Sequence, residues 1–294
     1  MAFLLGIVVS RLLATTSIPD TTPASVNWDA QPGWNPIHVF FGKMNHLYDP
    51  IPENWYLKRD APKHTSSNSK EWFGQHGQDV AVAKFFNFKP NGYFVDLASN
   101  DAVWASNTFA LEQNMDWKGI CIEANPIYWY RLAFRTNCHI VGSIVGGSDF
   151  QEITVNLPTD PRASGPFGGI AGGEFDNKQG DQPRYTASLM TILDKFQAPK
   201  IIEYLSLDVE GAELFILGEF PFHQPYTFQL MSIERPKDLL KKKLEEAGYK
   251  HVLDFKRGDT LWAHESVYET GMENVKLNPQ EIETHIVEDW PKIK

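Results

Sequence analysis

The chain of 294 residues contains only two cysteines, Cys121 and Cys138, and this small number limits its chemistry. Two thiols are too few for a disulfide framework or a zinc site. Cys121 stands in an apolar run and is interpreted most simply as a small core residue. The two cysteines could also meet across neighbouring strands, so the cysteine content by itself indicates no particular redox compartment.

Basic residues are also scarce. The chain has 27 Lys and Arg against 37 Asp and Glu, which gives a formal net charge of −10. Because binding to phosphate backbones needs clustered basic side chains, we expect no nucleic-acid partner. The densest basic run, Lys241–Lys243, is interpreted as the solvated face of a helix. Hydrophobic residues at 42% and charged residues at 22% are typical of a soluble globular protein.

A long hydrophobic run is missing as well, since a membrane-spanning helix needs about 20 apolar residues. Residues 1–16 form a signal-like or anchor-like segment, in which Ser10 and Arg11 interrupt the apolar stretch and no basic start precedes it. The chain also lacks an Asn-x-Ser/Thr sequon. Two locations therefore stay open. The N-terminal segment could associate with a membrane and direct the protein into the secretory pathway or Golgi, or the protein could be cytoplasmic.

The remaining chain divides into three parts by composition. Residues 17–70 are rich in Trp and Pro and are expected to form an arm packed on the main domain, because disordered linkers rarely hold many indoles. Residues 71–268 alternate strand-like and helix-like runs, the pattern of a parallel sheet with crossover helices. Residues 269–294 form an acidic tail with a docking or solvating role.

Two features refine the predicted domain. His251–Lys256 and Thr260–His264 flank a turn with a central glycine, which predicts an antiparallel hairpin. We therefore predict an α/β fold with a doubly wound, mostly parallel sheet closed by a C-terminal antiparallel hairpin. Six glycines crowd residues 158–184, which predicts a long loop inserted in the domain. A mobile surface insertion and a substrate-gating loop are both compatible with that composition.

The first motif that carries chemistry is Phe94–Asp101. Asp96 ends a predicted strand and small residues follow it, so a ligand can approach the backbone closely. In open parallel sheets, ligands bind outside the carboxyl ends of the strands. Asp96 could accept a hydrogen bond from an ammonium group of such a ligand, or it could cap the following helix.

The second motif is Gly119–Pro126, in which Glu123 ends the next predicted strand. A carboxylate at this place accepts the ribose hydroxyls in nucleotide-binding folds. Glu123 lies 27 residues beyond Asp96, somewhat farther than in the dinucleotide fingerprint, and no G-x-G-x-x-G is present. NAD and FAD are therefore disfavoured. A surface glutamate at a strand end is the alternative interpretation.

The third motif places Asp208, Glu210 and Glu213 within six residues, directly after an apolar strand. Such clustering is costly unless a cation, a proton or a partner relieves the repulsion. A divalent metal is conceivable, but no histidine stands nearby to complete a familiar ligand set, so we expect none. Glu213 also suits a helix N-terminus, where it would complement the helix dipole.

Together, these motifs resemble the signature of the FkbM family of S-adenosylmethionine-dependent methyltransferases. YLSLDVEGAE at residues 204–213 carries the resemblance with SLMTILDKF at 188–196. The resemblance covers roughly residues 72–265. Its other motifs are residues 74–79, the segments GYFVDLASNDAVWASNTFALE and WKGICIEANPIYWYRL, and residues 232–236. The predicted hairpin ending is also usual in the class I methyltransferase fold and unusual in dinucleotide-binding dehydrogenases.

The resemblance implies methyl transfer from S-adenosylmethionine to a hydroxyl on a sugar, glycan or other small acceptor. It implies that Asp96, Ala98 and Asn100 line the methionine end of the cofactor. It also implies that Glu123 binds the ribose with Asn125 close by.

The same resemblance implies that Asp208 and Glu210 face the reaction centre. An alcohol nucleophile benefits from a general base, for which we expect Asp208 or Glu210, and then Glu234. His223 and His139 are outside candidates.

One departure from the family pattern leaves an alternative open. Many members carry glycines after the first acid, where this chain has Leu97, Ala98 and Ala102. A non-catalytic binding or scaffold module that keeps the fold is therefore the main rival. A nucleotide-sugar or nicotinamide enzyme is a second rival, and the missing glycine fingerprint disfavours it.

Overall fold

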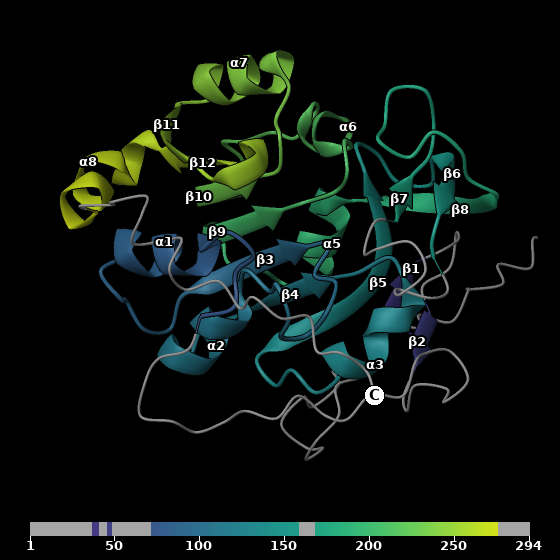
Figure 1. Cartoon of the computed structure of the whole chain (residues 1–294), viewed down its shortest axis with the longest axis horizontal. Helices are drawn as coiled ribbons and strands as arrows, with labels where there is room; N and C mark the ends of the chain where they lie inside the picture. The colour runs from purple at the N-terminus through teal and green to yellow at the C-terminus, as the bar shows by residue number, and fades with distance from the viewer. Residues whose placement is uncertain (1–36, 41–45, 49–71, 159–167, 276–294) are drawn as a thin grey trace, which may run out of the picture. The chain divides into compact units, whose positions relative to one another are not determined.

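The computed structural model describes residues 37–40, 46–48, 72–158 and 168–275. In it, the alternating apolar and amphipathic runs of the sequence form a mixed α/β structure (Figure 1). The strands are β1 (Ile37–Phe40), β2 (His46–Tyr48), β3 (Tyr93–Leu97), β4 (Lys118–Ile122), β5 (Cys138–Gly146), β6 (Glu152–Asn156), β7 (Gly169–Ile170), β8 (Gln182–Ser188), β9 (Ile201–Leu207), β10 (Thr227–Ile233), β11 (Tyr249–Asp254) and β12 (Thr260–His264). The helices are α1 (Gln78–Phe85), α2 (Phe109–Met115), α3 (Trp129–Leu132), α5 (Leu189–Lys195), α6 (Glu213–Leu217), α7 (Asp238–Glu246) and α8 (Glu265–Asn274), with short 3-10 helices η3 (Pro126–Tyr128) and η4 (Lys256–Gly258).

The strands form one sheet in the order β11-β12-β10-β9-β3-β4-β5-β8-β6-β7. Strands β10, β9, β3, β4 and β5 run parallel to one another, which confirms the prediction of a mostly parallel α/β sheet. At one end, β12 pairs antiparallel with β10 and β11 pairs antiparallel with β12. The chain runs outward from β3 through β4 and β5, then crosses to β9 on the other side of β3. The order therefore reverses between β3 and β9, where ligands bind in open α/β sheets.

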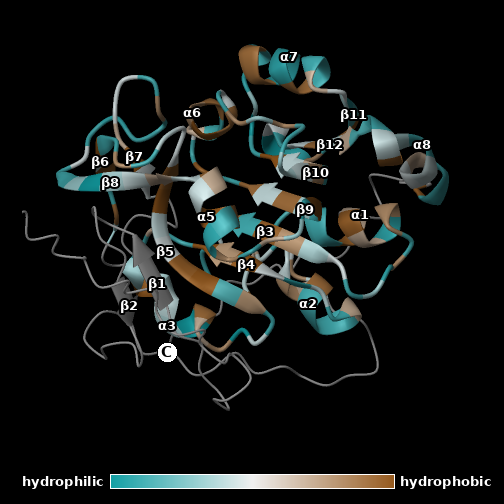
Figure 2. Ribbon diagram, turned by 180° about the vertical axis from the view of Figure 1, so that it is seen from behind, coloured by the Kyte–Doolittle hydropathy of each residue, from teal (hydrophilic) through white to brown (hydrophobic). Residues whose placement is uncertain are grey.

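Hydrophobic side chains cover both faces of this sheet. In β3, Val95 and Leu97 join one buried cluster and Phe94 joins the other, because successive side chains of a strand point to opposite faces. The first cluster includes α5, α6 and α7, and the second includes α1, α2 and α3. Figure 2 shows the hydrophobic colour concentrated in central strands such as β5 and β9. Burial on both faces explains why these strands appear in the sequence as nearly continuous apolar runs.

Two segments differ from the sequence prediction. The loop predicted across residues 158–184 contains β7 and the first part of β8, which pair with β6. Ile170 and Phe175 are buried there, so the described part of the insertion packs onto the domain. The acidic tail predicted from residue 269 begins inside α8, which lies against α1. Gly271 of α8 faces Phe85 closely, and Asn274 Nδ2 donates a hydrogen bond to the Phe85 carbonyl at 3.1 Å.

The two cysteines form a disulfide between the neighbouring strands β4 and β5. The Cα atoms of Cys121 and Cys138 lie 5.9 Å apart, and both residues are buried. The sequence left this pairing open because it could not place the two strands side by side. The disulfide ties together the two strands that follow β3 in the chain.

The N-terminal predictions fall largely outside the described residues. Strands β1 and β2 come from the segment predicted as an arm, and β1 pairs in parallel with β5. The rest of that arm, the signal-like segment 1–16 and residues 276–294 lie outside the described part of the chain. In the part that is described, no helix combines the length and apolar character needed to cross a bilayer.

Candidate functional site

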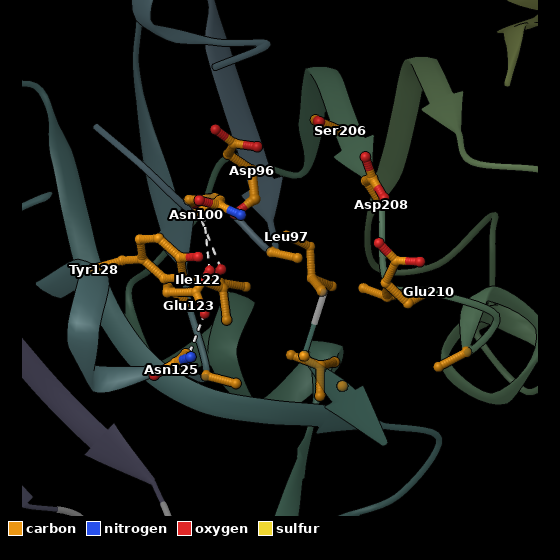
Figure 3. Close-up of a pocket in the computed structure, with 18 of the residues that line it drawn as sticks. Asp96, Leu97, Asn100, Ile122, Glu123, Asn125, Tyr128, Ser206, Asp208 and Glu210 are labelled. Carbon is orange, nitrogen blue, oxygen red and sulfur yellow. Dashed lines mark hydrogen bonds between the residues drawn. The ribbon is translucent and has the colours of Figure 1, made fainter. Parts of the chain in front are cut away.

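The ends of β3, β4 and β9 open onto one cavity, which is partly open to solvent (Figure 3). Apolar side chains and a few polar groups line it, as is usual in sites for small molecules. All five residues predicted to hold a cofactor line it, namely Asp96, Ala98, Asn100, Glu123 and Asn125. Asp208 and Glu210 line it too, whereas Glu234 does not. The structure therefore brings the three sequence motifs together around one space.

The turn after β3 takes an unusual backbone conformation. Ala98 has φ 64° and Asn100 has φ 53°, both in the left-handed region. This region costs a residue with a Cβ atom about 1 to 2 kcal/mol. Ala98 occupies it where many FkbM relatives are expected to carry glycine, and its methyl is the smallest side chain with that cost. The turn therefore keeps its tight path without glycine.

Asp96 is buried, and its carboxylate interacts with a hydroxyl group and a guanidinium group of the protein. Its Oδ2 atom accepts a hydrogen bond from Thr108 Oγ1 at 2.6 Å and lies 3.8 Å from Arg135 Nη1. Burial raises the pKa of Asp96, while Arg135 lowers it. Arg135 itself is buried and donates through Nε to Glu112 Oε2 at 2.8 Å. Arg135 was not predicted, because nothing in the loop after α3, 39 residues along the chain, marks it in the sequence as the counter-ion of Asp96.

Glu123 joins two turns of the cavity wall. Its Oε2 atom accepts the backbone N–H of Asn100 at 2.7 Å, and its Oε1 atom accepts that of Asn125 at 2.6 Å. Figure 3 shows these bonds on either side of the carboxylate. Burial raises the pKa of Glu123 to about 7. Each oxygen of a carboxylate can accept a further bond, so Glu123 can also meet a donor in the cavity.

Two amide oxygens in the cavity wall lack a donor. In the part of the chain that the structure describes, Asn100 Oδ1 and Asn107 Oδ1 are buried without a hydrogen-bond partner. Asn107 is held in place because its Nδ2 atom donates to Ser206 Oγ at 3.1 Å. A buried acceptor without a donor costs about 1 to 3 kcal/mol, so a ligand that brings donors would be favoured here. Asn107 was not predicted, although the segment that contains it was.

Part of the cavity wall is apolar and includes residues from the ends of β4 and β5. Buried aliphatic side chains form this part, and Tyr128 also lines the cavity. A flat apolar group of a ligand would fit against such walls. The aliphatic residues are Ile122, Ile144, Val145, Leu157 and Ile216.

The third motif is a cluster of carboxylates compensated by an arginine. One oxygen from each of Asp208, Glu210 and Glu234 lies within 4.8 Å of the others. Arg235 Nη2 lies 3.1 Å from Glu210 Oε2 and 2.8 Å from Asp176 Oδ2, and it also contacts Glu234 Oε1. A cation thus relieves the repulsion that the sequence indicated. Asp208, Glu210 and Glu234 were predicted from the sequence, whereas the role of Arg235, which follows Glu234 directly, was not.

A tight turn brings these carboxylates together. Strand β9 ends at Leu207, and Glu210 (φ 54°) and Gly211 (φ 92°) then reverse the chain. A Cβ atom at Gly211 would stand 2.8 Å from Asp176 Oδ1, so a side chain there would clash. Glu234 follows β10, and its Oε2 atom accepts the Glu210 N–H at 3.1 Å. Glu234 therefore supports the turn from outside the cavity.

The remaining candidates lie away from the cavity wall. Glu213 begins α6 and accepts the Gly211 N–H at 3.2 Å, which fits the helix-terminus alternative. His139 stacks near Phe196 at 5.1 Å, and His223 lies beside His264 at 6.2 Å. Two other residues that do line the cavity, Gln75 and Trp104, were not singled out in the sequence.

Comparisons with known proteins identify the family of this chain. The profile of the family described as methyltransferase FkbM domain matches residues 96–255, from Asp96 in β3 to the residue after β11. Neither the curated proteins nor the solved structures gave a match. The family match spans more than half of the chain and contains all eight predicted site residues. The chain therefore belongs to the FkbM methyltransferase family.

Proposed function

We propose that this protein is an S-adenosylmethionine-dependent methyltransferase that methylates a hydroxyl on a sugar, glycan or other small acceptor. The observation that carries the proposal is the single cavity at the ends of β3, β4 and β9, where hydrogen-bond acceptors and carboxylates converge. S-adenosylmethionine is rich in donors and carries positive charge. The polar side chains of this wall are suited to such a ligand.

The residues present fit the cofactor by chemistry. Glu123 would accept the ribose hydroxyls, because its carboxylate is fixed by two backbone N–H groups and keeps lone pairs for a donor. Asp96 and the unpartnered oxygens of Asn100 and Asn107 would accept from the ammonium group. The aliphatic part of the wall, together with Tyr128, would hold the adenine. When bound, the cofactor supplies a methyl group activated by the positive charge on its sulfur.

The chain's own residues would then position the acceptor. Asp208 and Glu210 stand at the end of β9 on the cavity wall, where a carboxylate can take the proton of a hydroxyl. Holding the hydroxyl in line with the methyl group can supply several kcal/mol of the barrier by positioning alone. The helices on both faces and the antiparallel pair β11 and β12 support the proposal that the sheet is doubly wound in the class I manner.

We also propose that the protein resides in the secretory pathway. The support is the Cys121–Cys138 disulfide, because disulfides persist in oxidising compartments and are rare in the cytosol. Mass spectrometry after thiol alkylation of protein isolated from its native cells tests this. Two alkylated cysteines in unreduced protein would contradict it.

A transfer assay tests the proposed activity. The full chain is incubated with methyl-labelled cofactor and a panel of sugars, glycans and glycolipids, and labelled product is measured. We expect label on at least one hydroxyl acceptor and its loss in the Asp208→Asn variant. Cofactor binding without transfer to any member of the panel would favour a non-catalytic module instead. Binding of a nicotinamide dinucleotide in place of S-adenosylmethionine would favour the other rival.

A further inference from the structure

We infer that Asp208 is the general base of this site and that the positive charge of the bound methyl donor ionises it. This inference rests on the proposed function and deepens it. It identifies one of three carboxylates as the base and states that ligand binding removes the proton from that group. Three observations carry it: where each carboxylate points, which of them Arg235 contacts, and which charges face Asp208.

The contacts of Arg235 distinguish the three candidate carboxylates from one another. Its guanidinium contacts Glu210 and Glu234, so these two side chains already share a fixed positive charge. Glu234 is also engaged with the Glu210 N–H and stands outside the cavity wall. Asp208 lies on the wall, and the ion pairs of Arg235 do not include it. Asp208 is thus the carboxylate of the cluster that faces the cavity without a cationic partner in the described structure.

The charged groups with the largest effect on Asp208 are acidic. Glu234 approaches from the end of β10 and shares a side-chain hydrogen bond with Asp208, Asp259 lies in the turn before β12, and Glu210 lies in the same loop as Asp208. Burial and these neighbours together raise the pKa of Asp208 well above its ordinary value. The free protein therefore holds a proton on Asp208 at a pH where an exposed aspartate has lost it.

A cationic ligand changes this balance. An opposite charge within about 4 to 6 Å lowers the pKa of a carboxyl by about 1 to 3. Asp208 lines the cavity, so a sulfonium ligand that binds there within this distance should release the Asp208 proton to solvent. The resulting carboxylate can accept the proton of the acceptor hydroxyl during transfer. The demethylated product, S-adenosylhomocysteine, is a neutral thioether at sulfur, so Asp208 keeps that proton when the product is bound.

Calorimetry can measure this linkage without knowing the acceptor. Each ligand is titrated into the full chain in two buffers with different ionisation enthalpies, between pH 6 and pH 8. Both ligands share the adenosine and amino-acid groups, so their difference isolates the charge on sulfur. We expect S-adenosylmethionine to release more protons than S-adenosylhomocysteine. Its affinity relative to the product should rise about tenfold over this range, which corresponds to a pKa change of about 1.

Two variants locate the proton. Asp208→Asn should abolish the difference between the ligands, whereas Glu213→Gln should keep it. Glu213 is a matched control because burial also raises its pKa to about 7, yet it lies outside the cavity wall. Loss of the difference in Glu210→Gln and not in Asp208→Asn would assign the proton to Glu210 and overturn the inference.

The comparison of proton release by the two ligands uses the wild-type protein, so it tests the inference even if a variant does not fold. Equal proton release by the two ligands would overturn the inference and leave the proposed function intact. No binding of either ligand would overturn the proposed function and this inference together.

Discussion

Arg235 Nη2 lies 3.1 Å from Glu210 Oε2, and this contact joins two loops that are 25 residues apart in the chain. The same guanidinium reaches Asp176 in the glycine-rich insertion at 2.8 Å. It therefore connects three segments of the site: the loop after β9, the end of β10 and the insertion. Arg235 balances charge that would otherwise push these segments apart.

Arg235→Gln should destabilise the protein more at pH 8 than at pH 5.5. At the higher pH the carboxyl of Glu210, whose pKa is raised to about 7, is ionised and loses its counter-ion. Because Arg235 is partly exposed, we expect a loss of about 1 kcal/mol at pH 8. Urea unfolding at both values measures it. Lys250→Gln, which removes an exposed pair with Glu269 at 3.3 Å, is the control and should be nearly neutral. An equal loss at both pH values would contradict the charge-balance account.

The apo protein should become less stable as the pH rises from 5 to 8. Burial raises the pKa of Glu123 from 4.5 to about 7, so its contribution is fully present below about pH 4.5 and is lost as the pH rises through about 7. For this one group the change is on the order of 3 kcal/mol. Chemical denaturation at several pH values should therefore show a smaller decline in Glu123→Gln than in the wild type. A wild-type stability that rises with pH over this range would refute the assignment.

Ala98→Gly should stabilise the protein slightly and preserve cofactor binding. Ala98 adopts φ 64°, which glycine adopts freely, although glycine also costs more unfolded-chain entropy. The two effects leave an expected gain of about 0.5 kcal/mol. Urea denaturation gives the stability, and calorimetry gives the affinity for S-adenosylmethionine. A clear loss of stability would mean that the methyl of Ala98 makes a packing contribution larger than its backbone strain.

Gly271→Ala tests the packing of α8 on α1. A Cβ atom at Gly271 would stand 2.0 Å from Phe85 Cζ, and Phe85 is buried and cannot move freely. Overpacking of this kind costs about 1 to 3 kcal/mol. Gly173→Ala is the matched control, because a Cβ atom there meets nothing within 4 Å. Thermal denaturation should show a lower Tm for the first variant only. Equal midpoints for both would show that α8 does not pack in this position.

The parts of the fold that followed from the sequence are those with strong local signals. The sequence predicts a strand at 201–208 and a helix at 188–196, and the structure has β9 at Ile201–Leu207 and α5 at Leu189–Lys195. Strand β8 was missed because its sequence contains Pro183 and Arg184, and its ordering comes from pairing with β6. Helix α8 was missed because its acidic sequence carries no strong helical signal. The helix packs on α1, and its contact with Phe85 lies far away in the sequence.

The same distinction explains the site. Asp96, Glu123 and Asp208 were singled out from the sequence because each stands at the end of a predicted apolar strand, and all three line the cavity. Their counter-ions and supports were not found, because Arg135 and Arg235 act through contacts that only the folded chain creates. The disulfide was left open for the same reason, since its pairing depends on which strands are neighbours.

Calorimetric titration of S-adenosylmethionine into the wild type and Glu123→Ala tests the cofactor site most directly. We predict binding by the wild type and an affinity lower by about tenfold to a hundredfold in the variant, because a hydrogen bond to a charged group contributes about 1.5 to 3 kcal/mol. Circular dichroism confirms that the variant is folded, and Glu213→Gln should bind as the wild type does. Absence of heat at high ligand concentration in the wild type, or unchanged affinity in Glu123→Ala, would contradict the account.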